Sequence, residues 1–519
     1  MAQQKSEDRV VPDGGVMPVQ PAGGGQGKAV SVEQTAEQLQ LPVATAEDPA
    51  GSAREVVRDR SRAGRARVPK AIVTEGKVPL AVMEEVVERL DQAMVKVVGN
   101  RGAPGPDGVT VGALREQWST IAPKLRTGLQ FGTYRPGVIR RALIPKAGGG
   151  QRGLGIPNVV DRVVMEAVRQ VLEPVYEPTF HPASHGFRPG RSCHTAITDA
   201  KRHVRDGYEW VVDIDLEKFF DRVNHQRLLA RLAQRVDDRR LLVLIGRMLK
   251  AKVVLPDGVV IGVDEGVPQG SPLSPLLSNI VLDELDTELA RRGHRFVRYA
   301  DDCNVYVRSE RAGTRVMASL TGFIQWRLRL RINTGKSAVA RPEDRHFLGF
   351  SLRVAHGRRR TVEVGLSERT KRNARARVRE LTPRTWGGTL ESCIHRVNVW
   401  LRGWHQFFGI ASAEEQQEMR RLDAHIRRRL RAIVLHHWKR QRTIARRLIA
   451  LGVKPHAAWR GVYTGHRSTW ALSHIPAVDH GLRNAYFANR GLLSVAKLHR
   501  DKRPAISAPA HPTMALEQG

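Results

Sequence analysis

Two adjacent aspartates, Asp301 and Asp302, have strand-forming residues on both sides, at 296–299 and 303–307. In a regular strand, neighbouring side chains point to opposite faces, so the two carboxylates would diverge. A tight hairpin breaks this alternation and lets both carboxylates reach one side of the turn. Such a pair, joined by a third carboxylate, is what two Mg²⁺ ions need to clamp a phosphoryl-transfer transition state. An isolated Asp-Asp pair is more often an exposed turn, so the neighbouring motifs must decide.

A third carboxylate is available upstream. Residues 210–215 are typical of a strand that contains Asp213 and Asp215 on one face, and Asp221 lies beyond its end. Each of the three is, taken alone, an ordinary helix cap or surface acid. Beside Asp301 and Asp302, a strand-end aspartate would complete a two-metal site.

A loop rich in Gly and Pro, residues 266–275, leads into the apolar run 276–282. Its prolines stiffen the entry, and Gly270 permits close approach of the backbone to a base or sugar. Taken alone, the loop indicates only a turn.

The charge of the chain indicates a polyanionic partner. The 519 residues include 85 Lys and Arg against 52 Asp and Glu, a net charge of +33. Codon bias toward Arg would explain the preference of Arg over Lys but not this excess. RNA or DNA fits better than a membrane surface, because no amphipathic anchor and no run of 18 apolar residues is present.

Cysteine usage and the N-terminus favour a reducing compartment. The three cysteines, Cys193, Cys303 and Cys393, are too far apart in sequence for a disulfide framework or a CxxC zinc site. The first residues lack the basic-then-apolar pattern of a signal peptide. We therefore expect a cytosolic protein.

Periodicity predicts an α+β domain from about residue 100 to 355, after an amphipathic helix over 78–99. Residues 365–450 are typical of basic helices, with 19 Lys or Arg and 6 Asp or Glu between Lys371 and Ala450. The strands expected are 139–145, 209–214, 253–263, 296–307 and 347–354. The helices expected are 161–175, 225–232, 241–249, 275–291 and 314–329.

Four segments occur in the order found in reverse transcriptases. They are 215–221, 268–270, 299–302, and 335–337 followed by 347–350. The chain most closely resembles the reverse transcriptase/maturases that group II introns encode. The residues that carry this closer match are 102–110, 144–146 with 152–157, 185–192 and 400–409, and the resemblance covers roughly residues 80 to 500.

The resemblance implies a right-hand polymerase fold followed by an α-helical thumb/maturase domain. Residues 1–75 would be a disordered or loosely attached extension, 76–360 the fingers and palm, and 361–450 the basic thumb/maturase (X) domain. Residues 451–501 would bind nucleic acid, and 502–519 would be a tail. In the thumb, the aromatics Trp400, Trp404, Phe407 and Phe408 would form core.

The family pattern places the catalytic, metal-binding carboxylates on Asp215, Asp301 and Asp302, and the cofactor would be two Mg²⁺ ions. Asp215 is favoured over Asp213 because it stands six residues before Asp221. The pattern also implies nucleotide-binding residues. Lys146 and Arg152 would hold the triphosphate, Phe220 would lie against the sugar 2′ position, Gln269 near the nascent base pair, and Lys336 would assist the leaving pyrophosphate.

Basic residues outside the palm would contact nucleic acid phosphates. The set comprises Arg188, Arg191, Arg402, Arg427, Arg428, Arg429, Arg431, Lys439, Arg440, Arg442, Arg446 and Arg447. The partners implied are group II intron RNA, target DNA, a primer-template duplex and dNTPs, with no membrane.

The leading hypothesis is an RNA-directed DNA polymerase that binds its intron RNA, assists splicing and copies the RNA during mobility, within a bacterial cytoplasmic ribonucleoprotein. One alternative is an RNA-binding splicing factor with secondary polymerase activity. Another is a reverse transcriptase recruited to a retron, a diversity-generating element or a defence system. Many relatives add an HNH endonuclease with paired cysteine ligands, and we expect that domain to be absent here.

Overall fold

The adjacent aspartates lie on a β-hairpin, as their sequence context predicts. Strands β6 (Arg295–Tyr299) and β7 (Asp302–Val307) pair antiparallel, with Tyr299 opposite Asp302. The connection is the two-residue step Ala300-Asp301, and Ala300 has a left-handed backbone with φ of +56°. The predicted continuous strand 296–307 is therefore two strands, because the turn falls on Ala300 and Asp301.

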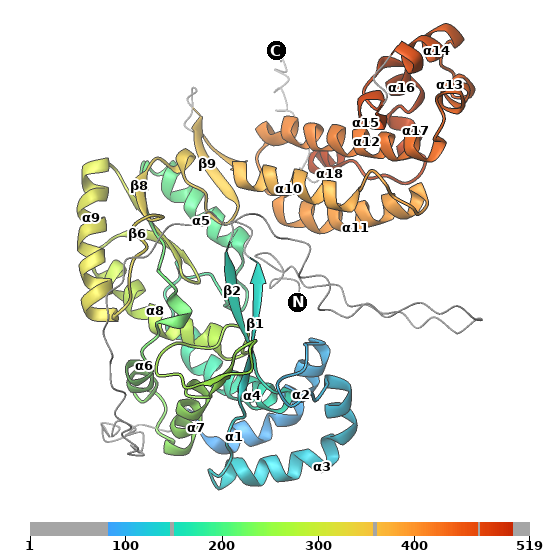
Figure 1. The fold of residues 1–519 in the computed structure, drawn as a ribbon. Helices are drawn as coiled ribbons and strands as arrows, with labels where there is room; N and C mark the ends of the chain where they lie inside the picture. The colour runs from blue at the N-terminus through green and yellow to red at the C-terminus, as the bar shows by residue number, and fades with distance from the viewer. Residues whose placement is uncertain (1–80, 146–149, 356–360, 465–467, 502–519) are drawn as a thin grey trace, which may run out of the picture. The chain divides into compact units, whose positions relative to one another are not determined.

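The computed structural model describes residues 81–145, 150–355, 361–464 and 468–501 (Figure 1). All of these lie in one of the two compact units into which the chain divides. The predicted N-terminal extension 1–75, the tail 502–519 and Lys146 lie outside the described residues. No helix within the described ranges has the length and apolar run that crossing a bilayer requires.

The palm sheet has the strand order β6-β7-β3-β8. Strand β3 (Trp210–Ile214) pairs antiparallel with β7 on one side and with β8 (Ala338–Ala340) on the other. Helix α9 (Glu310–Phe323) contacts β3, β7 and β8 (Figure 1). The predicted helix 314–329 is split, since a π-helical turn occupies Ile324–Leu328.

The two faces of this sheet pack against different hydrophobic cores. Val212 belongs with Val305 to a core whose other residues come mainly from 81–180 and 214–332. Val211, its neighbour in β3, belongs with Tyr306 to the core of the C-terminal helices. Successive residues of a strand point to opposite faces, so one strand contributes to both cores.

A second sheet, in the fingers, has the strand order β2-β1-β4-β5. Strand β1 (Ile139–Pro145) has the predicted bounds and pairs antiparallel with β2 (Gln151–Ile156). The predicted strand 253–263 is instead two short strands, β4 (Val253–Val254) and β5 (Val260–Ile261). The reason is a turn at Gly258, whose φ of +86° favours glycine.

Helices pack around both sheets. The predicted helix 78–99 is interrupted at Arg89, and both resulting helices, α1 and α2, contact α4. Helix α6 has the predicted bounds. The helices of this part are α1 (Met83–Glu88), α2 (Leu90–Gly99), α3 (Val111–Gln130), α4 (Val159–Tyr176), α5 (Cys193–Arg205), α6 (His225–Leu232), α7 (Arg239–Leu249) and α8 (Ser274–Arg291).

The C-terminal part begins with a second hairpin, β9 (Phe350–Ala355) paired with β10 (Thr361–Leu366), and is helical beyond it. A domain boundary at 360/361 would divide this hairpin, so we propose a boundary after Leu366. The helices are α10 (Glu368–Leu381), α11 (Leu390–Phe408), α12 (Gln416–Trp438), α13 (Gln441–Ala450), α14 (Pro455–Thr464), α15 (Thr469–Leu472), α16 (Pro476–Gly481), α17 (Asn484–Ala488) and α18 (Val495–Asp501).

The aromatic cluster of α11 packs inward. Trp400, Trp404, Phe407 and Phe408 all lie against the C-terminal core. The rings of Phe407 and Phe408 also approach Phe350 of β9, with centroids 5.8 and 5.3 Å away. The four aromatics are half-buried, so their helical spacing marks the border of the packed face of α11.

Two glycines of α9 provide a matched test of its packing on the palm sheet. A Cβ at Gly313 would overlap Val339 Cγ1 and lie 3.4 Å from Val307 Cγ2, whereas nothing lies within 4 Å of a Cβ at Gly322. We expect Gly313→Ala to lower the free energy of unfolding by about 1–3 kcal/mol through overpacking. Gly322→Ala should raise it by about 0.5–1 kcal/mol, since helix entropy alone changes. Urea unfolding measures both, and equal effects would contradict the packing described.

Candidate active site

The pairing of β3 with β7 brings two carboxylates to the same end of the palm sheet. Ile214 lies opposite Cys303 in this ladder. Asp215 follows Ile214 and Asp302 precedes Cys303, so the two aspartates leave neighbouring strands side by side. The turn at 335–337 is held against Asp215, whose backbone N–H donates to Ser337 Oγ at 2.9 Å. From this turn, Lys336 Nζ lies 3.8 Å from Asp215 Oδ2.

Asp301 shares an electrostatic environment with Asp215. Burial raises the pKa of Asp301 above its ordinary value; the positive charge of Arg152 opposes this shift, and the negative charge of Asp215 adds to it. A carboxylate whose pKa is raised by burial and by a neighbouring acid favours a bound cation beside it. The Lys336 ammonium places one positive charge beside Asp215, at a position that a divalent ion would suit.

In the part of the chain that the structure describes, no three His, Cys, Asp or Glu side chains are grouped closely enough to hold a metal ion by themselves. Mg²⁺ is commonly held by one or two carboxylates, with waters and substrate phosphates as its other ligands. Asp215 and Asp301 fit that pattern as protein ligands, and Asp302 lies in the same hairpin.

Asp213, which lies within β3 two residues before Asp215, has a different role. It is buried and forms an ion pair with Arg345, whose Nε donates to Asp213 Oδ2 at 2.8 Å. Its carboxylate thus joins the sheet to the segment before β9. Asp213 is thus occupied by a structural ion pair, and the choice of Asp215 as the catalytic acid stays a prediction.

The loop around Gln269 lies against the fingers strand β2. Arg152 Nε donates to Gln269 Oε1 at 2.7 Å, and Gly155 N donates to Gln269 O at 2.6 Å. Gly270 has φ of +110°, and a Cβ there would lie 2.8 Å from Gly155 O. A side chain at position 270 would push the loop off the strand. Arg152 and Gln269, both predicted to bind nucleotide, are thus brought together.

Phe220 is 8% exposed and packs edge-on against Phe219, with ring centroids 5.3 Å apart. Its carbonyl accepts a hydrogen bond of 2.7 Å from Val267 N, at the start of the Gln269 loop. Phe220 therefore joins the core to this loop. Lys336, in contrast, is exposed.

A buried arginine that the sequence reasoning missed supports the aspartate turn. Arg298 is completely buried and pairs with Asp286 of α8, from Nε to Oδ1 at 2.7 Å and from Nη2 to Oδ2 at 2.5 Å. Arg298 Nη1 also donates to Ala300 O at 2.8 Å and to Asn279 Oδ1 at 3.0 Å. The residue just before Asp301 is therefore fixed by a buried cation. An arginine in the middle of the apolar strand 295–299 was the available signal.

The segment 183–188 passes beside the same turn. Arg298 N donates to Ala183 O at 2.9 Å, and His185 N donates to Arg298 O at 2.8 Å. Asn279 Nδ2 donates to Gly186 O at 2.8 Å. A Cβ at Gly186 would overlap Ala300 N, so only glycine permits this approach.

Two residues predicted to bind nucleic acid are instead part of the interior. Arg188 is 9% exposed and bonds Glu177 Oε1 at 2.9 Å and the carbonyls of His181 and Ser184 at 2.8 Å. Arg429 is 6% exposed and donates to the hydroxyl and carbonyl oxygens of Thr382. Their donors satisfy buried oxygens, which corrects the prediction of phosphate contacts for both.

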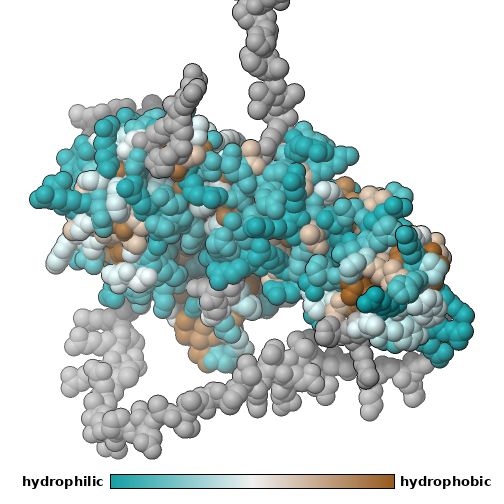
Figure 2. Space-filling view, turned by 90° about the horizontal axis from the view of Figure 1, so that it is seen from above, coloured by the Kyte–Doolittle hydropathy of each residue, from teal (hydrophilic) through white to brown (hydrophobic). Residues whose placement is uncertain are grey.

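The other predicted basic residues differ in accessibility. Arg431 forms an ion pair with Asp479, and Arg191 Nη1 donates to Pro182 O at 3.1 Å. Arg427 and Arg428 are half-buried. One face of the molecule is largely hydrophilic (Figure 2). The members of the predicted set that are exposed are Arg402, Lys439, Arg440, Arg442, Arg446 and Arg447.

Comparison with known protein families identifies the family of this chain. Residues 144–352 match the family "Reverse transcriptase (RNA-dependent DNA polymerase)", and residues 371–449 match "Group II intron, maturase-specific domain". The chain is 33% identical over 328 residues to Protein YkfC of Escherichia coli, an alignment that covers 55% of this chain and 86% of YkfC. The chain belongs to the group II intron reverse transcriptase/maturase family. Its enzyme class is RNA-directed DNA polymerase.

Two further relatives of this reverse transcriptase/maturase are intron proteins. The group II intron-encoded protein LtrA of Lactococcus lactis is 36% identical over 176 residues, 34% of this chain and 29% of LtrA. The putative COX1/OXI3 intron 2 protein of Saccharomyces cerevisiae is 33% identical over 169 residues, 33% of this chain and 20% of that protein. The alignments thus span less than a third of the length of these two relatives.

The Arg298–Asp286 pair generates a prediction about stability. Asp286→Asn keeps the shape of the side chain but leaves the buried guanidinium without its counter-ion, so we expect a loss of about 3–5 kcal/mol in the free energy of unfolding. Asp283→Asn is the matched control on the same helix, because its partner Arg231 is partly exposed. That control should cost about 1 kcal/mol or less. Urea denaturation compares them, and a similar cost for both would contradict a special role for the buried pair.

Proposed function

We propose that this chain is a polymerase that copies its group II intron RNA into DNA, binds that RNA and assists its splicing. The observation that carries the polymerase mechanism is that Asp215 and the Asp301-Asp302 turn lie at adjacent strand ends. The positive charge of Arg152 also acts on the Asp301 carboxylate. Asp215, Asp301 and Asp302 are the proposed catalytic acids. They would hold two Mg²⁺ ions.

When bound, Mg²⁺ would supply the positive charge that activates a primer 3′-hydroxyl and stabilises the departing pyrophosphate. The side chains of this protein do the positioning. The rigid turn before Asp301 fixes the carboxylates, which reduces the reorganisation that catalysis would otherwise require. The Lys336 ammonium, now beside Asp215, would be displaced toward the leaving group.

The nucleotide would lie between the fingers strand β2 and the palm. The Arg152 guanidinium suits phosphate oxygens, and Lys146 would add a second cation. Gln269, which accepts a hydrogen bond from Arg152, would border the nascent base pair. The ring of Phe220 would restrict space at the sugar 2′ position and so favour dNTPs.

The exposed cations of α11 to α13 support the RNA-binding part of the proposal. Six of the predicted residues are accessible there, and each phosphate that they neutralise would release counterions and make binding salt-dependent. The partners would be intron RNA, target DNA and a primer-template duplex, within a cytoplasmic ribonucleoprotein. The maturase-specific match over 371–449 covers all six of these residues and favours splicing over a retron or defence role.

Substitution of Asp213, within β3, and of Asp215, just after its end, distinguishes a structural from a catalytic carboxylate. We expect Asp215→Asn to slow primer extension on an RNA template about 10³-fold, which corresponds to losing about 4 kcal/mol of transition-state stabilisation. Asp213→Asn removes only the ion pair with Arg345, so its turnover per folded molecule should stay near that of the parent. Steady-state kinetics with Mg²⁺ provides the comparison. Normal extension by Asp215→Asn would contradict the proposed mechanism.

The maturase role predicts that catalysis and splicing separate. Asp215→Asn leaves the exposed cations unchanged, so this variant should stimulate splicing of the intron RNA to within about twofold of the parent. The substitution Arg446→Ala with Arg447→Ala should weaken RNA binding and splicing while primer extension on a short template continues. Splicing assays with purified protein test this. If folded Asp215→Asn protein failed to promote splicing, a polymerase-independent maturase role would lose its support.

A further inference from the structure

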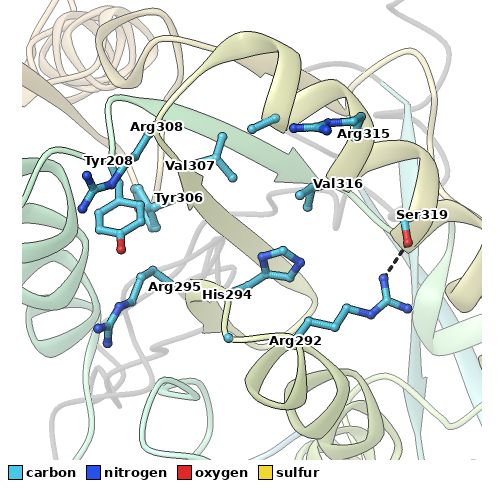
Figure 3. A pocket seen from close by; sticks show the side chains of 12 residues that line it. Tyr208, Arg292, His294, Arg295, Tyr306, Val307, Arg308, Arg315, Val316 and Ser319 are labelled. Atoms are coloured by element: carbon cyan, nitrogen blue, oxygen red, sulfur yellow. Dashed lines mark hydrogen bonds between the residues drawn. The ribbon is translucent and has the colours of Figure 1, made fainter.

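A basic pocket of about 530 Å³ lies at the edge of the palm, away from the aspartates. It is bordered by the start of β6, the end of β7 and helix α9 (Figure 3). Arg295 begins β6, four residues before Tyr299, so the pocket lies roughly 13 Å along the strand from the aspartate turn. The pocket is therefore separate from the candidate active site.

The pocket collects positive charge without matching negative charge. Four arginines line it, and the lining includes no carboxylate. Arg292 pairs with Glu288, with Nε and Oε1 2.7 Å apart, and shares this carboxylate with Arg291. Arg295, Arg308 and Arg315 form no ion pair with any carboxylate in the described ranges. Like charges gathered around one cavity repel, so a bound anion would stabilise this arrangement.

Tyr208 holds two of these guanidinium groups in place. The interaction with the guanidinium of Arg295, and then with that of Arg308, lowers the pKa of the Tyr208 hydroxyl, and Arg308 Cζ lies 5.0 Å from the centre of the ring. Cation–π contact of this kind fixes a long side chain at little cost in hydration. Figure 3 shows Tyr208, Arg295 and Arg308 grouped together at one side of the pocket.

The opposite side is ordered by a different contact. Arg292 Nη1 donates to Ser319 Oγ at 2.6 Å, and the imidazole of His294 lies between the two sides (Figure 3). Burial, and then the charge of Arg292, lowers the pKa of His294, which favours the neutral imidazole. Val307 and Val316 contribute apolar lining, which strengthens charge interactions in the pocket.

We propose that this pocket binds phosphate groups, and that its ligand is the sugar-phosphate backbone of RNA. Guanidinium groups offer paired N–H donors that match phosphate oxygens. Arg295, Arg308 and Arg315 are exposed, so a polymer can reach them from solvent. The choice of RNA rests on the proposed function, whereas the affinity for phosphate rests on the pocket alone.

The test measures binding of a mixed-sequence, 5′-hydroxyl, single-stranded RNA to the full chain at several salt concentrations. Replacing two phosphate contacts, with Arg295→Ala and Arg308→Ala together, should reduce the slope of log affinity against log salt by about 1.4. Arg315→Ala, on the exposed face of α9, should reduce it by about 0.7 and does not disturb Tyr208. Primer extension on a short template should remain, which keeps this test independent of the catalytic proposal.

The control removes two charges that lie near the pocket but do not line it, with Arg291→Ala at the end of α8 and Arg311→Ala at the start of α9 together. An equal change in slope for this pair would overturn the proposal, because net charge alone would then explain the effect. Calorimetry with inorganic tripolyphosphate provides the second arm. Loss of tripolyphosphate binding in the pocket variants with an unchanged RNA slope would overturn RNA as the ligand. If neither probe distinguished the pocket variants from the parent, the phosphate site itself would be refuted.

Discussion

The ion pair between Arg298 and Asp286 is the interaction on which the catalytic turn depends. Both side chains are fully buried, and an isolated charge in such a place would cost several kcal/mol. The pair is retained with Arg298 also bonded to Ala300 O, so the cation connects α8 to the turn that carries Asp301. A left-handed residue at Ala300 requires such support, because that conformation is costly for residues other than glycine.

The same cation organises the segment that precedes α5. The backbone of Arg298 pairs with residues 183–185, and its side chain donates to Ser184 Oγ at 2.7 Å. The turn that carries the carboxylates is thus held by hydrogen bonds between the hairpin, helix α8 and the segment 183–186. This arrangement suits a centre whose ligands must stay fixed while substrates change.

The sequence predicted part of the fold, whereas the catalytic and nucleotide-binding roles that it assigned stay predictions. The aspartate hairpin, strand β1 and helix α6 follow from local patterns, because alternation and turn residues determine them directly. Helix α5 was missed although Ser192 and Thr195 form a capping box at its start, since its polar composition hides its buried face. Arg298, Arg188 and Arg429 could not be assigned to the interior, because the partners that satisfy them are brought together only by tertiary structure. Charge alone marks an arginine as exposed.

Strand β3 has a further consequence for how the protein unfolds. Val211 and Val212 are consecutive residues, yet each contributes to a different hydrophobic core. The sheet thus separates the two cores, and loss of either core would expose one face of the sheet to water. Each core is consequently less stable without the other, so the two cores should unfold together. The palm sheet couples their unfolding because it contributes residues to both.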